Sequence, residues 1–258
     1  MSKNKILLSV FFTLLIVSGS VYAGDWQTIL KGIKDKYAGY QDKIKDIMII
    51  RENRLDTPEG EITSDSKTYK KGIKFRNEMV MEMPNMPQGM PAIKTIVIYD
   101  GEDTWMISPF MGKKKLPADQ ARGYKRQEDW WTWLSENGEL VGSEKIDDQD
   151  CYIVKLDVEK TPYSRIWITK EDFAVIKAEF KDKDKSGVIR FSDYKELSGF
   201  AFPYRIDIYM EGEHQASMLV KSAEVNTGLS DELFDPDKVE MPDMQEMMKY
   251  MQKGAGTE

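Results

Sequence analysis

The stretch WITKEDFAVIKAEFKDKDKSGVIRFSDYKELSGFAFPYRIDIY, Trp167 to Tyr209, alternates apolar and polar side chains over most of its length. In and beside it, apolar residues recur at every second position in three segments: Ile166 and Ile168; Ile176, Ala178 and Phe180; Ile206, Ile208 and Met210. A period of two indicates strands with one buried face and one wet face. The polar run KDKDKSG is typical of a hairpin tip. The stretch therefore predicts consecutive antiparallel strands whose alternating isoleucines form a buried wall.

The same pattern extends over most of the chain, from about Lys45 to about Asn226. It predicts about eleven strands, and no internal repeat or linker rich in Pro, Gly or Ser divides them. Asp100-Gly101 marks a further hairpin turn, whereas the basic run Lys113–Lys115 is interpreted as a solvated turn. A flat sheet of eleven one-sided strands would expose a whole apolar face, so the sheet must curl or close. The fold class is mainly β, with helices covering the concave face.

Two helices are candidates for that cover. Asp25 can cap the first, whose apolar positions recur at helical spacing. These positions are Trp26, Ile29, Leu30, Ile33 and Tyr37. The second is a short helix predicted by RQEDWWTWLSENG, Arg126 to Gly138, in which Trp130, Trp133 and Leu134 fall at i, i+3 and i+4. We expect the aromatic face of this helix to lie against the apolar wall.

The N-terminus carries the pattern of a secretory signal peptide. Lys3 and Lys5 precede the apolar run Ile6–Val17, and Val21-Tyr22-Ala23 offers small residues at the −3 and −1 positions. The apolar run is much shorter than the roughly 20 residues that span a bilayer. We therefore expect cleavage after Ala23 and a periplasmic location.

Cleavage divides the chain into three predicted parts: the signal peptide 1–23, a lipid-binding domain 24–240 and a Met-rich tail 241–258. The signal peptide takes away two lysines and no acid, so the formal charge changes from −7 to −9. This negative balance argues against nucleic acid, or an anionic membrane surface, as the main partner.

Catalysis finds little support in the sequence. The single histidine, His214, lies in a charged hairpin tip, which leaves no His-activated nucleophile and no His-rich zinc site. The single cysteine, Cys151, cannot form an intramolecular disulfide, and its strand context predicts a buried, inert thiol. No glycine-rich loop resembles a phosphate cradle. We therefore expect no enzymatic activity and no cofactor.

Methionine is concentrated in two places. EMVMEMPNMPQGMP, Glu78 to Pro91, contains five methionines, and the tail segment EMPDMQEMMKYM contains five more. On a strand, Met79, Met81 and Met83 would line one face. Thioethers adapt to irregular apolar ligands, and they also ligate Cu(I), so an acyl-binding wall and a copper site are both open.

The two readings of the methionine cluster predict different outcomes for the triple substitution Met79→Leu, Met81→Leu and Met83→Leu. Leucine keeps the apolar volume but cannot ligate a metal, so a copper site would be lost and an acyl-binding wall would be retained. Titration with Cu(I) measures the difference, and unchanged copper binding would remove this site from consideration.

The stretch from Trp167 to Tyr209, followed by NTGLSDELFDP, closely resembles the outer-membrane lipoprotein-sorting proteins, relatives of the periplasmic carrier LolA. Upstream, GIKFRNEMVMEMP and IYDGEDTWMISPF are similar to the paired strands and the Asp-Gly hairpin of that carrier. The similarity covers about Lys45 to Pro236. It implies an incomplete antiparallel β-barrel of about eleven strands, with helices lidding a hydrophobic cavity. Arg76 falls near an arginine that influences lid opening in the carrier family.

The resemblance implies a periplasmic carrier that binds the acyl chains of a lipoprotein or a lipid. Its partners would be a membrane-embedded donor or exporter and an outer-membrane acceptor. We expect Met79, Met81 and Met83 with Trp105 to line the wall or mouth of the cavity, and Trp130, Trp133 and Leu134 to act as a lid. The alternatives are a lipid-responsive regulator of the RseB type and a Met-based Cu(I)-binding protein.

Overall fold

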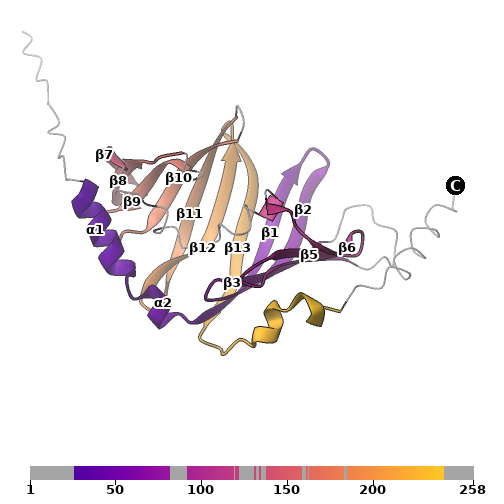
Figure 1. Cartoon of the computed structure of the whole chain (residues 1–258). Helices are drawn as coiled ribbons and strands as arrows, with labels where there is room; N and C mark the ends of the chain where they lie inside the picture. Colours follow the sequence, from indigo (N-terminus) through magenta and orange to yellow (C-terminus); the bar gives the residue numbers. More distant parts are fainter. Residues whose placement is uncertain are drawn as a thin grey trace, which may run out of the picture.

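A computed structural model describes residues 26–81, 92–118, 120–121, 131, 134, 138–158, 161, 163–182 and 185–240. Within these residues a single antiparallel sheet of thirteen strands dominates (Figure 1). The predicted signal peptide and Met-rich tail lie outside the described residues. No helix in the described ranges is long and apolar enough to cross a membrane.

The strands of the sheet are β1 (Asp46–Thr57), β2 (Gly60–Lys71), β3 (Lys74–Met81), β4 (Ile93–Tyr99), β5 (Thr104–Ser108), β6 (Gly112–Lys115), β7 (Glu139–Ile146), β8 (Gln149–Lys155), β9 (Tyr163–Thr169), β10 (Val175–Asp182), β11 (Lys185–Leu197), β12 (Phe200–Met210) and β13 (Glu213–Val225). The helices are α1 (Trp26–Tyr37) and α2 (Tyr40–Lys43), with the 3-10 turns η2 (Asp231–Phe234) and η3 (Pro236–Lys238).

The strand count exceeds the expected eleven, and the basic run Lys113–Lys115 accounts for one strand. We expected a solvated turn there, but these lysines form β6, which pairs with β5 from Ser108↔Gly112 to Trp105↔Lys115. The sequence GKKK has no apolar alternation. The strand that it forms lies at the edge of the sheet. Lysine is common on such edges, since its charge discourages pairing with another chain.

The order of the strands describes a barrel that is opened once. β1 pairs with β13 in the middle of the sheet, and the two edges are β6 and β7, which are consecutive in the chain. The sheet would close if β6 paired with β7, but these strands lie at opposite ends of it (Figure 1). The expected incomplete antiparallel barrel is therefore confirmed.

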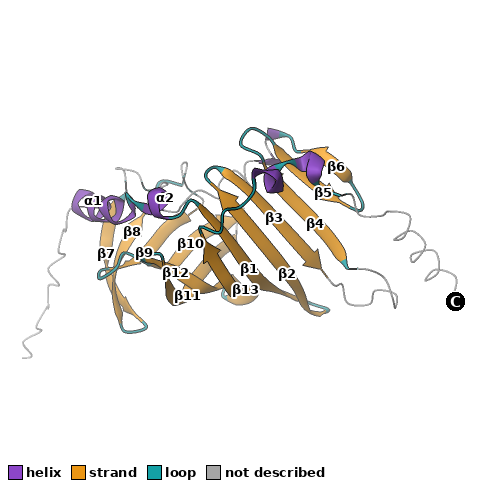
Figure 2. Ribbon diagram, turned by 90° about the horizontal axis from the view of Figure 1, so that it is seen from below, coloured by secondary structure: helices purple, strands orange, loops and turns teal. Residues whose placement is uncertain are grey.

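Helix α1 covers one face of the sheet, which we call the inner face. Its apolar positions are buried in one large cluster, together with residues from β1, β8, β9, β10 and β12. Figure 2 shows α1 and α2 beside the end of the sheet formed by β7 to β10. The helical residues in the cluster are Trp26, Ile29, Leu30, Ile33 and Tyr37. The helix predicted from their spacing is thus confirmed, and it packs on the apolar half of the inner face.

The opposite face, which we call the outer face, carries a second cluster. Ile96, Ile98 and Ile107 of β4 and β5 pack there against Phe234 and Val239, which follow the last strand. Because successive side chains on a strand point to opposite faces, β4 contributes alternate residues to the two sides. The segment after β13 therefore covers the outer face at the end of the sheet away from α1.

One expected set of neighbours is divided between the two faces. Ile176 was expected to share the buried wall with Ala178, but it packs on the outer face with Cys151 and Trp167. A register shift between Val175 and Lys177 in the pairing of β10 with β9 interrupts the alternation. Ala178 remains in the inner cluster.

Cys151 is fully buried on β8, as expected for an inert thiol. Burial raises the pKa of the Cys151 thiol above its ordinary value, which lowers the fraction of reactive thiolate at neutral pH. The thiol also donates a hydrogen bond to the carbonyl of Gln149 over 3.4 Å.

Asp46 fastens the chain after β13 to the start of β1. Its carboxylate accepts hydrogen bonds from the backbone N–H groups of Thr227 (2.8 Å), Gly228 (3.0 Å) and Leu229 (3.3 Å), and from the Thr227 hydroxyl (3.1 Å). Burial alone would raise the pKa of Asp46, but these donors outweigh it and hold the pKa below 3.8. The ionised carboxylate is therefore the form that stabilises this junction.

Substituting Asp46→Asn should lower the free energy of unfolding by about 2 kcal/mol at neutral pH, because charge-assisted hydrogen bonds are lost in a buried place. Since the folded-state pKa of Asp46 is depressed, its stabilising contribution is complete above pH 3.8 and is lost as the pH falls through the folded-state pKa. The difference between the two proteins should therefore shrink in acid. Denaturant titrations at pH 7 and pH 3 measure it.

The matched control is Asp148→Asn, because the Asp148 side chain is fully exposed. This variant should match the wild type at each pH. Equal stability of the Asp46 variant and the wild type at pH 7 would contradict the assigned role.

Candidate functional site

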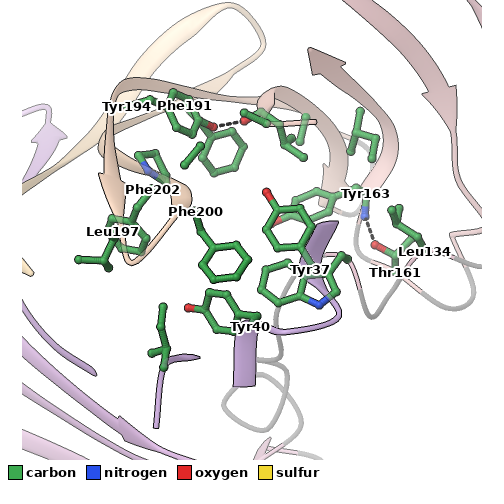
Figure 3. A pocket seen from close by; sticks show the side chains of 18 of the residues that line it. Tyr37, Tyr40, Leu134, Thr161, Tyr163, Phe191, Tyr194, Leu197, Phe200 and Phe202 are labelled. Carbon is green, nitrogen blue, oxygen red and sulfur yellow. Dashed lines mark hydrogen bonds between the residues drawn. The ribbon is translucent and has the colours of Figure 1, made fainter. Parts of the chain in front are cut away.

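A cavity of about 280 Å³ lies between the ends of α1 and α2 and the inner face of the sheet. Most of the side chains around it are aromatic or aliphatic, and Figure 3 shows how they face the open space. The lining residues are Tyr37, Tyr40, Ile44, Trp131, Leu134, Leu156, Thr161, Tyr163, Ile166, Ala174, Val175, Ala178, Phe191, Tyr194, Leu197, Phe200, Ala201, Phe202 and Pro203. Such a wall suits hydrocarbon.

Four aromatic rings form one side of the cavity, and we call them the aromatic cage: Tyr37, Tyr40, Trp131 and Phe200. Tyr37 stacks on Trp131 with ring centres 4.2 Å apart, and Tyr40 meets Trp131 edge-on at 4.7 Å. Phe200 lies 5.7 Å from Tyr37 and 4.9 Å from Tyr40. The rings come from α1, α2, the connection between β6 and β7, and β12. The cage therefore joins three regions that are far apart in the sequence, because Tyr37 and Tyr40 are only three residues apart.

The opposite wall consists of strands β9 to β11 and carries a few hydroxyl groups. Tyr194 donates a hydrogen bond to the carbonyl of Val175, and the Thr161 hydroxyl accepts one from the backbone N–H of Tyr163 over 3.3 Å (Figure 3). Burial raises the pKa of Tyr163 and of Tyr194, so both phenols are neutral at physiological pH. The described lining contains no carboxylate, imidazole or thiol, so it offers groups for binding and none for acid-base chemistry.

Five residues predicted for the cavity lie at or beside it. Leu134 and Ile166 line the space directly. Ile168 is fully buried in the same inner cluster, one pleat further along β9. Ile206 stands opposite the lining residue Phe191 in the pairing of β11 with β12, and Ile208 stands opposite Ile189. Two of the five predicted residues thus line the cavity and three lie near it, and contacts between any of them and a ligand stay a prediction.

Met79 and Met81 lie on β3, opposite Ser66 and Ser64 of β2. They are half-buried, and they share a face because they are two residues apart. They do not belong to the lining of the cavity. Met83, Trp130 and Trp133 lie outside the described residues, so their expected positions stay predictions. In the described ranges, no three His, Cys, Asp or Glu side chains are grouped to hold a metal.

Trp105 and Arg76 lie on the outer face, away from the cavity. Trp105 packs against the outer cluster and donates from Nε1 to Asp100 over 3.0 Å. Arg76 binds Glu78 at 2.7 Å and donates from Nη1 to the carbonyl of Leu233 over 3.0 Å. Because successive side chains of β3 and β5 alternate between the two faces, these side chains lie on the outer face and their neighbours in the chain lie on the inner face. Their predicted roles at the mouth and in the lid stay untested.

Sequence reasoning missed most of the aromatic cage. Trp131 was passed over because helical spacing favoured Trp130 and Trp133 as the inward face. Tyr40 follows the last periodic position of the first helix, and Phe200 precedes the strand alternation, so neither stood out. Trp131, Tyr40 and Phe200 are aromatic and lie near the ends of predicted helices or strands, which is the feature of the sequence that could have indicated the cage.

Substituting Phe200→Ala should lower the free energy of unfolding by about 3 kcal/mol, because it removes a ring that contacts two others in a buried place. The matched control Phe110→Ala should leave stability nearly unchanged, since Phe110 is 54% exposed. Thermal unfolding of both variants measures the difference. Equal midpoints would show that the cage does not hold α1 and α2 on the sheet.

Comparisons with known proteins agree with this geometry. A family model described only as an uncharacterized protein matches residues 102–241, which is more than half of the chain. No curated protein matches the sequence.

Three solved structures share the fold at low sequence identity. A domain assigned to the outer membrane lipoprotein-sorting proteins of Vibrio parahaemolyticus has a TM-score of 0.58 and 16% identity, covering 81% of this chain and 96% of its own. A DUF1329 family protein from Desulfovibrio piger has a TM-score of 0.56 and 20% identity, with coverages of 82% and 99%. A LolA superfamily protein from Nitrosomonas europaea has a TM-score of 0.55 and 16% identity, with coverages of 81% and 99%.

The family match covers strands β5 to β13, and the structural matches extend over most of the chain. The structural matches show that the overall fold is shared. The chain belongs to this family of uncharacterized proteins, and it is a LolA-like protein in fold.

Proposed function

We propose that the protein is a periplasmic carrier that binds acyl chains of a lipoprotein or a lipid and transfers them between membrane partners, without chemical conversion. The observation that carries the proposal is the cavity between α1, α2 and the inner face, with its aromatic and aliphatic lining. The LolA-like fold supports it, because one structural relative is described as a lipoprotein-sorting domain.

The size of the cavity bears on what it holds. Its volume of about 280 Å³ is just below the roughly 300–1,000 Å³ of most small-molecule sites. It accommodates part of an acyl chain as it stands, and a longer segment requires the aromatic cage to open. Tyr40 belongs to a short segment, since α2 has only four residues and follows directly on Ala38 and Gly39. Movement of α2 would enlarge the space without breaking the sheet.

The close packing of α1 makes its N-terminal half the fixed part of the cover. A methyl group on Gly138 would lie 2.6 Å from the Trp26 ring, and one on Gly32 would lie 2.9 Å from the Phe173 ring. Both distances are shorter than carbon contacts allow, so these glycines let the helix approach the sheet. We therefore assign the opening to the end of α1 and to α2.

The expected result of native mass spectrometry on protein isolated from its own periplasm is a bound lipid or acyl chain. The variant Ala178→Leu should bind a fluorescent fatty acid about tenfold more weakly, because Ala178 is buried in the wall and the longer side chain fills the space. Ala118→Leu, at an exposed position outside this cavity, is the matched control and should bind like the wild type.

Absence of lipid from the isolated protein, together with no uptake of the fatty acid, would contradict the proposal. Uptake that is equal in the wild type and the Ala178 variant would place the ligand elsewhere. A stable complex with one membrane partner, strengthened or weakened by lipid, would favour a sensor over a carrier.

A further inference from the structure

The polarity of the inner side chains of the sheet changes at β1 and β2. The half beneath α1 is apolar, whereas on β2 the inner positions Ser64, Ser66 and Thr68 are hydroxyl residues that are 8%, 4% and 6% exposed. They stand opposite Asn53, Arg51 and Ile49 of β1 in a pairing that has no register shift. These polar positions therefore lie on the same inner surface as the apolar half, between it and the apolar residues Phe75 and Met79 of β3.

The polar side chains at these inner positions form hydrogen bonds with one another. Thr68 Oγ1 accepts hydrogen bonds from Arg51 Nη1 over 3.0 Å and from Asn77 Nδ2 over 2.9 Å. Asn53 Nδ2 donates to Ser66 Oγ over 3.0 Å. These contacts fix the Arg51 side chain over strands β1 and β2.

Arg51 and Lys70 are the charged residues at the inner positions of β1 to β3, and Arg51 has no acidic partner among the residues that the structure describes. Its Nε is buried without a hydrogen-bond acceptor among the described residues, which is costly for a charged group. Burial lowers the pKa of Arg51 to about 10, so the guanidinium is still charged at neutral pH.

The outer face of the same strands is different, because the arginines there are paired. Arg54 lies 2.6 Å from Glu52, and Arg76 lies 2.7 Å from Glu78. The described inner positions of β1, β2 and β3 include no acidic residue, because the acids of these strands fall on the alternate positions. Within the described part of the chain, the charge of Arg51 therefore has no acidic counterpart on the inner face of these strands.

Arg51 lies at the border of the apolar half. Ile49, two residues earlier on β1, is buried in the inner cluster, and a two-residue step along a strand is about 7 Å. Val220 of β13 stands directly opposite Arg51 and packs against the same cluster. A molecule lying along the inner face would thus meet the guanidinium where the apolar surface ends.

We propose that the inner face binds an anionic amphiphile, with its hydrocarbon chain on the apolar half and its carboxylate or other oxyanion on Arg51, assisted by Asn53 and Asn77. This inference rests on the proposed function, and it specifies the class of ligand. A guanidinium donates a fork of N–H groups to an oxyanion, and an acceptor at Nε would satisfy the buried donor.

The test measures binding of palmitate, hexadecanol and inorganic phosphate to the full exported chain stripped of lipid. Palmitate carries chain and anion, hexadecanol carries the chain alone, and phosphate carries the anion alone. The wild type should prefer palmitate to hexadecanol by about tenfold or more, because the charge-assisted hydrogen bonds are made to palmitate only. Phosphate should bind far more weakly than palmitate.

Arg51→Met should remove the preference for palmitate while leaving the affinity for hexadecanol unchanged. Arg54→Met, on the outer face of the same strand, is the matched control and should keep the wild-type ratio. The wild-type ratio needs no variant, so poor folding of Arg51→Met would leave the test intact.

Equal affinity of the wild type for palmitate and hexadecanol would overturn the inference and leave the acyl carrier standing. Phosphate binding as tight as palmitate binding would overturn it as well, since the chain would then contribute nothing. Failure of palmitate and hexadecanol alike to bind would contradict the proposed function itself.

Discussion

The pairing of β1 with β13 is the constraint on which the rest of the structure depends. It joins residues about 170 positions apart, from Ile47↔Val225 to Leu55↔Ala216, and places the first and last strands side by side in the centre of the sheet. The break in the sheet is thereby moved to β6 and β7, which are neighbours in the chain. Asp46 holds the adjoining backbone at the end of this ladder. The consequence is an opened barrel with the pairing of β1 and β13 at its centre.

The pairing of β1 with β13 also determines which elements cover each face of the sheet. The inner face carries α1 and the cavity beside β8 to β12, and the outer face carries the segment after β13 over β4 and β5. Each cover lies on one half of the sheet, and on the inner face of β1 to β3 the polar side chains around Arg51 lie beside apolar ones such as Phe75 and Met79. A ligand on this surface would find hydrocarbon at one end and Arg51 at the other. This arrangement suits binding and release, because no covalent chemistry is needed to hold an amphiphile.

Sequence periodicity located the strands and the first helix because a period of two or of 3.6 is a local property. Ile166, which belongs to this alternation, lies in the lining of the cavity. Periodicity does not say on which face of the sheet a buried side chain lies, and only the structure shows that Trp105 and Ile176 pack on the outer face. The edge strand β6 escaped detection because its lysines carry no apolar pattern.

The sequence by itself determined a one-sided antiparallel sheet covered by an amphipathic helix, since side-chain alternation and helical spacing follow from local backbone geometry. It also determined that Cys151 is buried and that the described cavity must be built without histidine chemistry. Only the tertiary structure decided which strands are neighbours, which rings form the aromatic cage and that Arg51 lies on the inner face without an acidic partner among the described residues. Those outcomes depend on strand register and on contacts between residues far apart in the chain, and a shift of one residue in register exchanges the two faces of a strand.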